Sequence, residues 1–260
     1  MAVVTFNQYL TLIHVQAIMK LKSQANTLIL SYLWWIIEPL LYVLLFYFVF
    51  KYVMYAGQGD FFIFLIVGKI PFLWFSKSIT SGANSIIENR GIVNQRIIPK
   101  WLFPMVNCQE ASYKQVVSFL VLFIALIVSG YEPSNNWYQL IPLLFLNYFL
   151  ICGVAMLCSV FVTFVPDFKL ALQFIMMGLM FTSGIFWDPN LIQDETLKQL
   201  LLYLNPLAAL VDGYRQVLMY DNQLNLGYML AVFLWGFVSL VLGLFLLKKF
   251  NNTLTRKLFS

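Results

Sequence analysis

The stretch SIIENRGIVNQRIIPKW, residues Ser85 to Trp101, is a polar island between two long apolar runs. It carries three basic side chains, Arg90, Arg96 and Lys100, against one acidic side chain, Glu88. Short basic loops of membrane proteins lie preferentially in the cytosol. We therefore expect the island to face the cytosol and to connect two membrane spans.

The first half of the island has the signals of a short helix. Asn84 can cap its beginning, and Gly91 can end it. We therefore predict a short exposed helical segment within residues 84–100. Local features leave two interpretations open: the segment is either a solvated connector or a docking site for another protein.

The composition of the whole chain places the island in a membrane protein. Of the 260 residues, 61% are hydrophobic and only 10% are charged, which is more apolar than a soluble domain of this length requires. A helix needs about 20 residues to cross about 30 Å of hydrocarbon. We therefore predict an all-α integral membrane protein with six spans and a single domain, residues 1–260.

Working outward from the island, the long apolar runs give the spans. The predicted spans are residues 32–53, 61–80, 102–128, 137–165, 170–187 and 226–247. Before them, residues 5–23 repeat apolar side chains at helical spacing with polar side chains on the other faces. This pattern predicts an amphipathic helix in the cytosolic headgroup layer.

Residues 188–225, between the last two spans, do not fit a simple span. They contain two apolar stretches that are each too short to cross the membrane. We expect a re-entrant or interfacial helical hairpin on the outer side, packed against protein or lining a wet cavity. Its candidate residues are the break between the two stretches and the charges in the second: Asn205, Pro206, Asp212 and Arg215.

The distribution of basic residues orients this topology. Eleven of the sixteen Lys and Arg residues fall in segments that the six-span scheme places in the cytosol, and three fall in outer loops. This bias predicts that both termini are cytosolic. The first 30 residues also lack the order of basic start, apolar core and cleavage site that marks a signal peptide.

Several short motifs, in matching order along the whole chain, resemble the ABC-2 type permeases. They are LWWIIEP at 33–39, GKIPF at 68–72, the island itself, LNPL at 204–207 and DGYR at 212–215. More narrowly, the chain is similar to the permease subunits of polysaccharide ABC exporters. Those subunits move O-antigen, capsule or teichoic acid chains.

The resemblance implies a homodimer in the bacterial cytoplasmic (inner) membrane, with a translocation pathway between its subunits and two copies of a separate ABC ATPase. The ATPase would use ATP and Mg, and this chain would bind no cofactor, metal or nucleic acid. The cargo would be a lipid-linked polysaccharide, foremost O-antigen. The island would be the coupling helix, contacting the ATPase through Ile87, Glu88, Asn89, Arg90 and Gly91. The chain has no GxxxxGK[ST] motif of its own.

Charged residues inside the predicted spans are costly and need a reason. If the first two spans are antiparallel neighbours, Glu38 and Lys77 lie at the same depth and can pair. Glu110 and Lys114 are four residues apart on one helix face and can also pair. We expect both pairs to be structural.

Aromatic side chains and one lysine are candidates for the substrate pathway. Trp35, Tyr42 and Phe46 share one side of the first span, and flat rings suit the C–H faces of sugars. Lys69 can meet a lipid-linked pyrophosphate or sugar hydroxyls. The alternatives are that the aromatic residues pack helices or form an interfacial belt, and that Lys69 snorkels to the outer interface.

Other functions fit the sequence less well. There is no HExxH or GxSxG motif, and no span has paired carboxylates, so we predict no catalytic residue and no enzyme. A secondary transporter would more often show matching broken helices in two halves. Capsule or teichoic acid export, and ABC-2 export of a small drug or lipid, stay open as alternatives.

Overall fold

The computed structural model describes residues 5–27, 31–49, 52, 61–95 and 98–258, and every regular element in these ranges is helical. The all-α prediction is confirmed. The helices are α1 (Phe6–Thr27), α2 (Ser31–Phe48), α3 (Phe61–Glu88), α4 (Arg90–Gln95), α5 (Leu102–Val128), α6 (Leu140–Phe164), α7 (Phe168–Thr182), α8 (Glu195–Leu204), α9 (Pro206–Leu218), α10 (Leu226–Lys249) and α11 (Asn251–Lys257). Short 3-10 turns at Asn135–Gln139 and Pro189–Leu191 precede α6 and α8.

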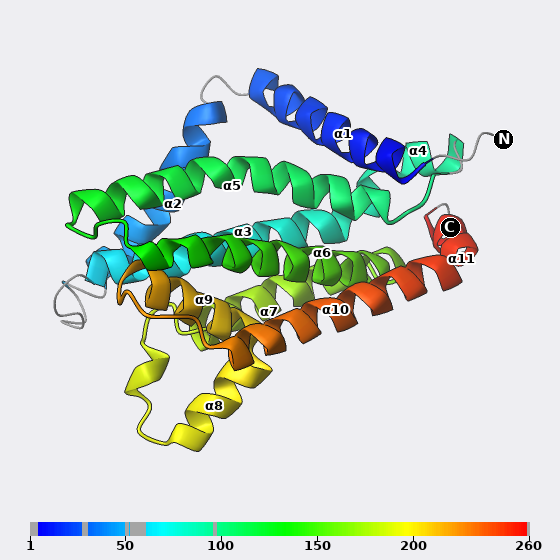
Figure 1. The fold of residues 1–260 in the computed structure, drawn as a ribbon. Helices are drawn as coiled ribbons and strands as arrows, with labels where there is room; N and C mark the ends of the chain where they lie inside the picture. Colours follow the sequence, from blue (N-terminus) through cyan, green and yellow to red (C-terminus); the bar gives the residue numbers. More distant parts are fainter. Residues whose placement is uncertain (1–4, 28–30, 50–51, 53–60, 96–97, 259–260) are drawn as a thin grey trace.

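Helix α3 lies at the centre of the molecule and contacts α2, α5, α6, α7 and α9. Figure 1 shows α3, α5, α6 and α10 running alongside one another, with α1 on the outside of α5. The start of α1, α4 and α11 gather at one end, and α8 and α9 lie toward the other. This grouping matches the predicted separation of cytosolic and outer segments, whose sidedness stays a prediction.

Helices α6 and α10 make the closest pairing. A Cβ atom added at Gly153 would lie 2.5 Å from the Ser239 Oγ and 2.6 Å from the Gly236 carbonyl oxygen. Only glycine leaves room for the backbones at this distance. Small residues at helix contacts are how membrane helices gain packing without a hydrophobic driving force.

Four helical stretches in the described part of the chain are long and apolar enough to cross a membrane: Phe61–Glu88, Leu102–Val128, Asn135–Phe164 and Leu226–Lys249. They match the second, third, fourth and sixth predicted spans. Helix α2 takes the place of the first and α7 that of the fifth. The count of six spans therefore stays a prediction.

The helix at the place of the fifth predicted span is shorter than that prediction. Helix α7 has 15 residues and is about 22 Å long, less than the roughly 30 Å of a hydrocarbon core. It ends at Thr182, although the apolar run extends to Trp187, because Gly184 has a φ of +70° that an α-helix does not accept. The chain turns there instead of continuing.

The segment predicted at 84–100 also has different boundaries. Helix α3 continues to Glu88, a turn at Asn89 follows, and α4 begins at Arg90. Asn84 is not a cap, because its side chain donates to the Thr80 carbonyl inside α3. Gly91 does not end a helix but lies in the first turn of α4. The Thr80 hydroxyl and the Asn84 amide donate to carbonyls four residues earlier, so these polar side chains are satisfied within the helix.

The predicted amphipathic helix is α1. Ile13 and Ala17 are buried against Leu102 and Val106 at the start of α5, while other apolar side chains, such as Met19, are exposed. A helix with one face on protein and apolar residues on its exposed side suits the headgroup layer. That location stays a prediction.

The segment between α7 and α10 is a pair of short helices, as predicted. Asn205 separates them and caps α9, because its Oδ1 accepts hydrogen bonds from the backbone N–H groups of Leu207 and Ala208. Pro206 occupies the first turn of α9, where its missing N–H costs nothing. The Asn205 amide also donates to the Ser183 hydroxyl, which ties the hairpin to the end of α7.

Candidate functional site

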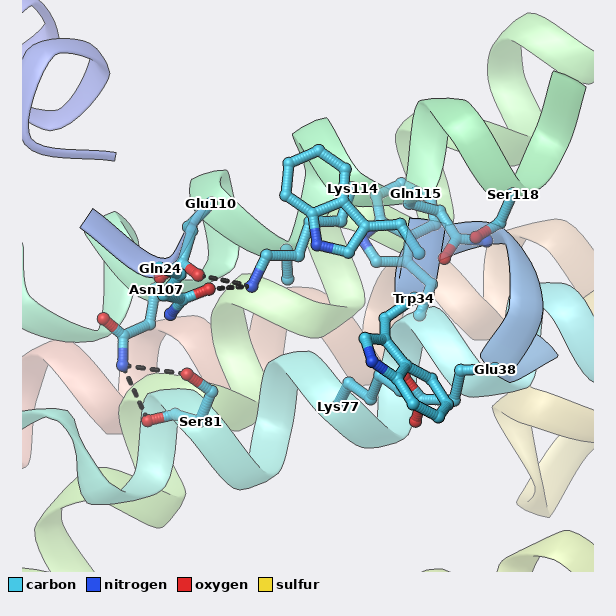
Figure 2. Close-up of a pocket in the computed structure, with 13 residues that line it drawn as sticks. Gln24, Trp34, Glu38, Lys77, Ser81, Asn107, Glu110, Lys114, Gln115 and Ser118 are labelled. Carbon is cyan, nitrogen blue, oxygen red and sulfur yellow. Dashed lines mark hydrogen bonds and ion pairs between the residues drawn. The ribbon is translucent and has the colours of Figure 1, made fainter. Parts of the chain in front are cut away.

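The structure brings the charged residues of three helices to one pocket of about 270 Å³ (Figure 2). The end of α1 closes it on one side. The lining residues are Gln24 of α1; Trp34, Trp35 and Glu38 of α2; Trp74, Lys77 and Ser81 of α3; and Asn107, Glu110, Ala111, Lys114, Gln115 and Ser118 of α5. We call this the inner pocket. The sequence predicted its two ion pairs but did not predict that they share a cavity.

The first ion pair joins α2 to α3. The Lys77 Nζ lies 2.6 Å from the Glu38 Oε2, as the depth argument expected, and the two side chains are 48% and 41% exposed. In Figure 2, Trp34 lies beside both. Because the pair is half exposed, its groups remain accessible to a molecule in the pocket.

The second ion pair belongs to α5 and reaches α1. The Lys114 Nζ lies 2.6 Å from the Glu110 Oε1 and donates to the Gln24 Oε1 at 2.6 Å (Figure 2). It also lies 5.9 Å from the centroid of the Trp35 ring, which is within cation–π distance. Lys114 therefore connects three helices, whereas the sequence predicted only a local pair.

A polar chain continues from the pocket toward α1. The Lys20 ammonium donates to the Asn107 Oδ1 at 2.6 Å, and the Asn107 amide donates to the Ser81 carbonyl at 2.8 Å. Sequence reasoning missed Asn107. Its signal was a polar stripe along a predicted span, since Asn107, Glu110 and Lys114 recur at helical spacing.

The predicted pathway residues are only partly described. Trp35 lines the inner pocket, whereas the side chains of Tyr42 and Phe46 lie outside the described residues, as does Arg96 of the island. Their pathway roles stay predictions.

Lys69 lies in the interior and is 3% exposed. Its Nζ donates to the Met180 Sδ of α7 at 2.9 Å and lies 5.3 Å from the centroid of the Phe72 ring. Snorkelling to the outer interface does not match this burial. A pathway role for Lys69 stays a prediction.

The residues predicted to contact an ATPase surround the turn between α3 and α4. Glu88, Arg90 and Gly91 are exposed, whereas Ile87 packs against the main core. The Asn89 amide donates to the Ser85 carbonyl at 2.7 Å and holds the turn. The charged residues are therefore available to a partner, and the contact itself stays a prediction.

A second polar centre lies at the opposite end, around Arg215 of α9, which is fully buried. Its guanidinium donates to the Gly184 carbonyl at 2.6 Å and the Ile185 carbonyl at 2.9 Å, both just after α7. It also donates to the Phe64 carbonyl of α3 at 3.2 Å and stacks on the Phe64 ring at 3.4 Å. We call this the arginine knot, and it joins α9 and α3 to the segment that follows α7.

The arginine knot explains two of the sequence motifs together. A Cβ atom added at Gly68, in GKIPF, would lie 2.8 Å from the Arg215 Nη2, in DGYR. The glycine therefore makes room for the guanidinium. The neighbouring Asp212 accepts instead from Asn190 at 3.0 Å and Gln216 at 3.2 Å.

In the part of the chain that the structure describes, no cluster of three or more His, Cys, Asp or Glu residues could hold a metal ion. The accessible polar groups of the inner pocket can recognise a ligand, and the hydrogen bonds of the arginine knot hold its helices together.

Comparison with known proteins fits this architecture. The model of the ABC-2 type transporter family matches residues 13–219, from α1 to the end of α9. The chain belongs to this family. As an ABC-2 transporter with several long apolar helices, it is a multi-pass membrane protein and a transporter subunit.

Curated relatives of this ABC-2 chain carry export names. An O-antigen export system permease protein RfbA of Klebsiella pneumoniae is 28% identical over 233 residues, covering 88% of both chains. The RfbA protein of Myxococcus xanthus is 26% identical, over 79% of this chain and 78% of its own. The polysialic acid transport protein KpsM of Escherichia coli is 28% identical, over 83% of this chain and 84% of its own.

Proposed function

We propose that this chain is the membrane subunit of an ATP-driven exporter that moves a lipid-linked polysaccharide, foremost O-antigen, across the bacterial cytoplasmic membrane. The observation that carries the proposal is its similarity to O-antigen export permeases over 88% of both chains. A pocket with three tryptophans and two ion pairs adds support, because such groups suit sugars. The chain itself would not be an enzyme.

The proposed assembly has two copies of the chain, with the pathway between them, and two copies of a separate ABC ATPase that uses ATP and Mg. Both termini would lie in the cytosol. The ATPase would grip the exposed turn at Glu88 and Arg90 and move α4. The family supports a partner of this class.

The path of helix α3 supports a coupling mechanism. Because α3 is one helix from Glu88 to Phe61, with Pro71 inside it, movement of the turn would be transmitted along this helix. Lys77 lies 11 residues from that end, about 16 Å along the helix, and the Phe64 carbonyl beneath Arg215 lies farther along it. ATP closure of the partner would thus reach the inner pocket and the outer hairpin together.

Capsule export is the second candidate, because KpsM of Escherichia coli aligns with 83% of this chain at similar identity. Deleting the gene and restoring it from a plasmid separates the two. O-antigen export predicts loss of the lipopolysaccharide ladder and polysaccharide accumulation inside the cell, with the capsule unchanged. Capsule export predicts the reverse pattern.

The deletion strain that carries the gene on a plasmid also tests whether the chain binds an ATPase subunit. A tagged chain extracted in mild detergent should bring down a soluble subunit with a nucleotide-binding Gly-rich loop in stoichiometric amount. Unchanged surface polysaccharides after deletion would contradict the proposed cargo. Purification of the chain alone under several gentle conditions would contradict the proposed energy source.

A further inference from the structure

The inner pocket presents aromatic faces and hydrogen-bonding groups to the same space. Trp34, which is 46% exposed, and Trp35 come from α2. The ion pairs Glu38–Lys77 and Glu110–Lys114 come from α2, α3 and α5. A sugar ring has an apolar C–H face and an edge of hydroxyls, so it can satisfy both kinds of group at once.

The charges decide between a sugar and a diphosphate. The two ammonium groups that line the pocket are each 2.6 Å from a carboxylate, so the lining pairs cancel, and the nearby Lys20 ammonium donates to the Asn107 Oδ1 and does not line the pocket. A diphosphate would lose water and meet two carboxylates with no net attraction from the lining charges to compensate. A hydroxyl, in contrast, can donate to a carboxylate and accept from the neighbouring ammonium.

Size and position narrow the ligand further. A volume of about 270 Å³ holds one sugar ring and not an extended chain. Along α5 the lining runs from Asn107 to Ser118, roughly 8 to 24 Å from the helix start at Leu102. The pocket therefore begins near the end that carries α4, where a cargo coming from the cytosol would arrive.

We propose that the inner pocket binds one uncharged sugar residue of the exported chain, in the half of the membrane nearer α4, before the chain enters the translocation pathway. This rests on the proposed function and adds to it a site within a single subunit. The tryptophan rings stack on the C–H face of the sugar, and the ion pairs exchange hydrogen bonds with the sugar hydroxyls.

Cysteine labelling tests this site, because the three native cysteines are all buried. Ala111→Cys places a thiol in the pocket lining, and Ser129→Cys places one at an exposed position after α5. The full chain, with the ATPase that co-purifies, is placed in lipid nanodiscs free of glycoside detergents. The probe is the free repeat oligosaccharide, released from the cell's own surface polysaccharide, and inorganic pyrophosphate is the comparison.

The oligosaccharide should slow maleimide labelling of Ala111→Cys several-fold and leave Ser129→Cys unchanged, and pyrophosphate should protect neither. Trp34→Leu should abolish the protection, whereas Trp235→Leu, at a side chain of similar exposure in α10, should preserve it. If Ala111→Cys does not fold, Ser118→Cys provides the same readout.

Two results would overturn the site. One is an absence of protection in protein that exports polysaccharide in cells, and the other is equal protection by pyrophosphate. Both leave the proposed function standing. A result against the proposed function would come from a different experiment, as unchanged surface polysaccharide after gene deletion.

Discussion

The inner pocket and the arginine knot differ in how their charged groups are paired and how far these groups are exposed. In the pocket, each ammonium is paired with a carboxylate, and the Glu38–Lys77 pair is nearly half exposed. In the knot, Arg215 is fully buried and its hydrogen bonds go to backbone carbonyls. An accessible pair can exchange partners with a ligand, whereas a buried guanidinium holding two loop carbonyls cannot be released cheaply. We therefore assign ligand exchange to the pocket and fixed geometry to the knot.

The largest effect is expected from Arg215→Gln. The substitution leaves the carbonyls of Gly184 and Ile185 without their donor, and each unsatisfied buried group costs about 1–3 kcal/mol. We expect loss of folded protein after extraction, measured as the monodisperse peak in size-exclusion chromatography. Lys198→Gln, on the partly exposed helix α8, is the control and should fold normally. A normal peak for Arg215→Gln would show that folding does not require the arginine knot.

Gly68→Ala should have the next largest effect. Its Cβ would lie 2.8 Å from the Arg215 Nη2 and 3.3 Å from Val211 Cγ1. Because three hydrogen bonds hold the guanidinium, it cannot swing away, and overpacking of this kind costs roughly 1–3 kcal/mol. Thermal unfolding in detergent should occur at a lower temperature than in the wild type. Gly178→Ala, where nothing lies near the added atom, should not show this decrease.

Reversing the charges of the Glu38–Lys77 pair should have a smaller effect on stability. A half-exposed pair is worth about 0.2–1 kcal/mol, but either single reversal places two like charges next to each other. Glu38→Lys or Lys77→Glu alone should reduce export, and the double variant should restore it. The measurement is surface polysaccharide per cell at equal protein level. No recovery in the double variant would mean that the pair does more than hold α2 to α3.

The smallest structural effect is expected at the turn between α3 and α4. Glu88 and Arg90 are exposed, so replacing both with Ala should leave folding unchanged. Because these residues would transmit the ATPase movement, we expect lower ATP turnover by the assembled complex and unchanged turnover by the isolated ATPase. If ATP turnover in the complex were unchanged, Glu88 and Arg90 would not transmit the ATPase movement. The turn would then not link the inner pocket to the arginine knot.

The sequence predicted those features that depend on composition and local spacing. Helix α5 begins and ends where the apolar run does, and Asn205-Pro206 divides α8 from α9 as expected. The depth argument also found the Glu38–Lys77 contact, because antiparallel neighbours place equal depths together.

The rest depends on contacts that no local pattern contains. The end of α7 is fixed by Gly184, whose carbonyl also binds Arg215 from a segment 31 residues away in the chain. Helix α3 continues past Asn84, whose side chain bonds back to the Thr80 carbonyl, and Ile86 belongs to the same buried apolar cluster as Leu254 of α11. The shared pocket needs α1, α2, α3 and α5 in place together, and a sequence gives only their faces.

The most direct test of the account measures ATP-driven polysaccharide transfer in inverted membrane vesicles. Vesicles carrying the wild-type chain and its ATPase, supplied with ATP and Mg, should accumulate polysaccharide in a lumen protected from added glycosidase. Vesicles without the chain, or without ATP, should not. Equal accumulation with and without ATP would contradict an ABC-driven export function for this chain.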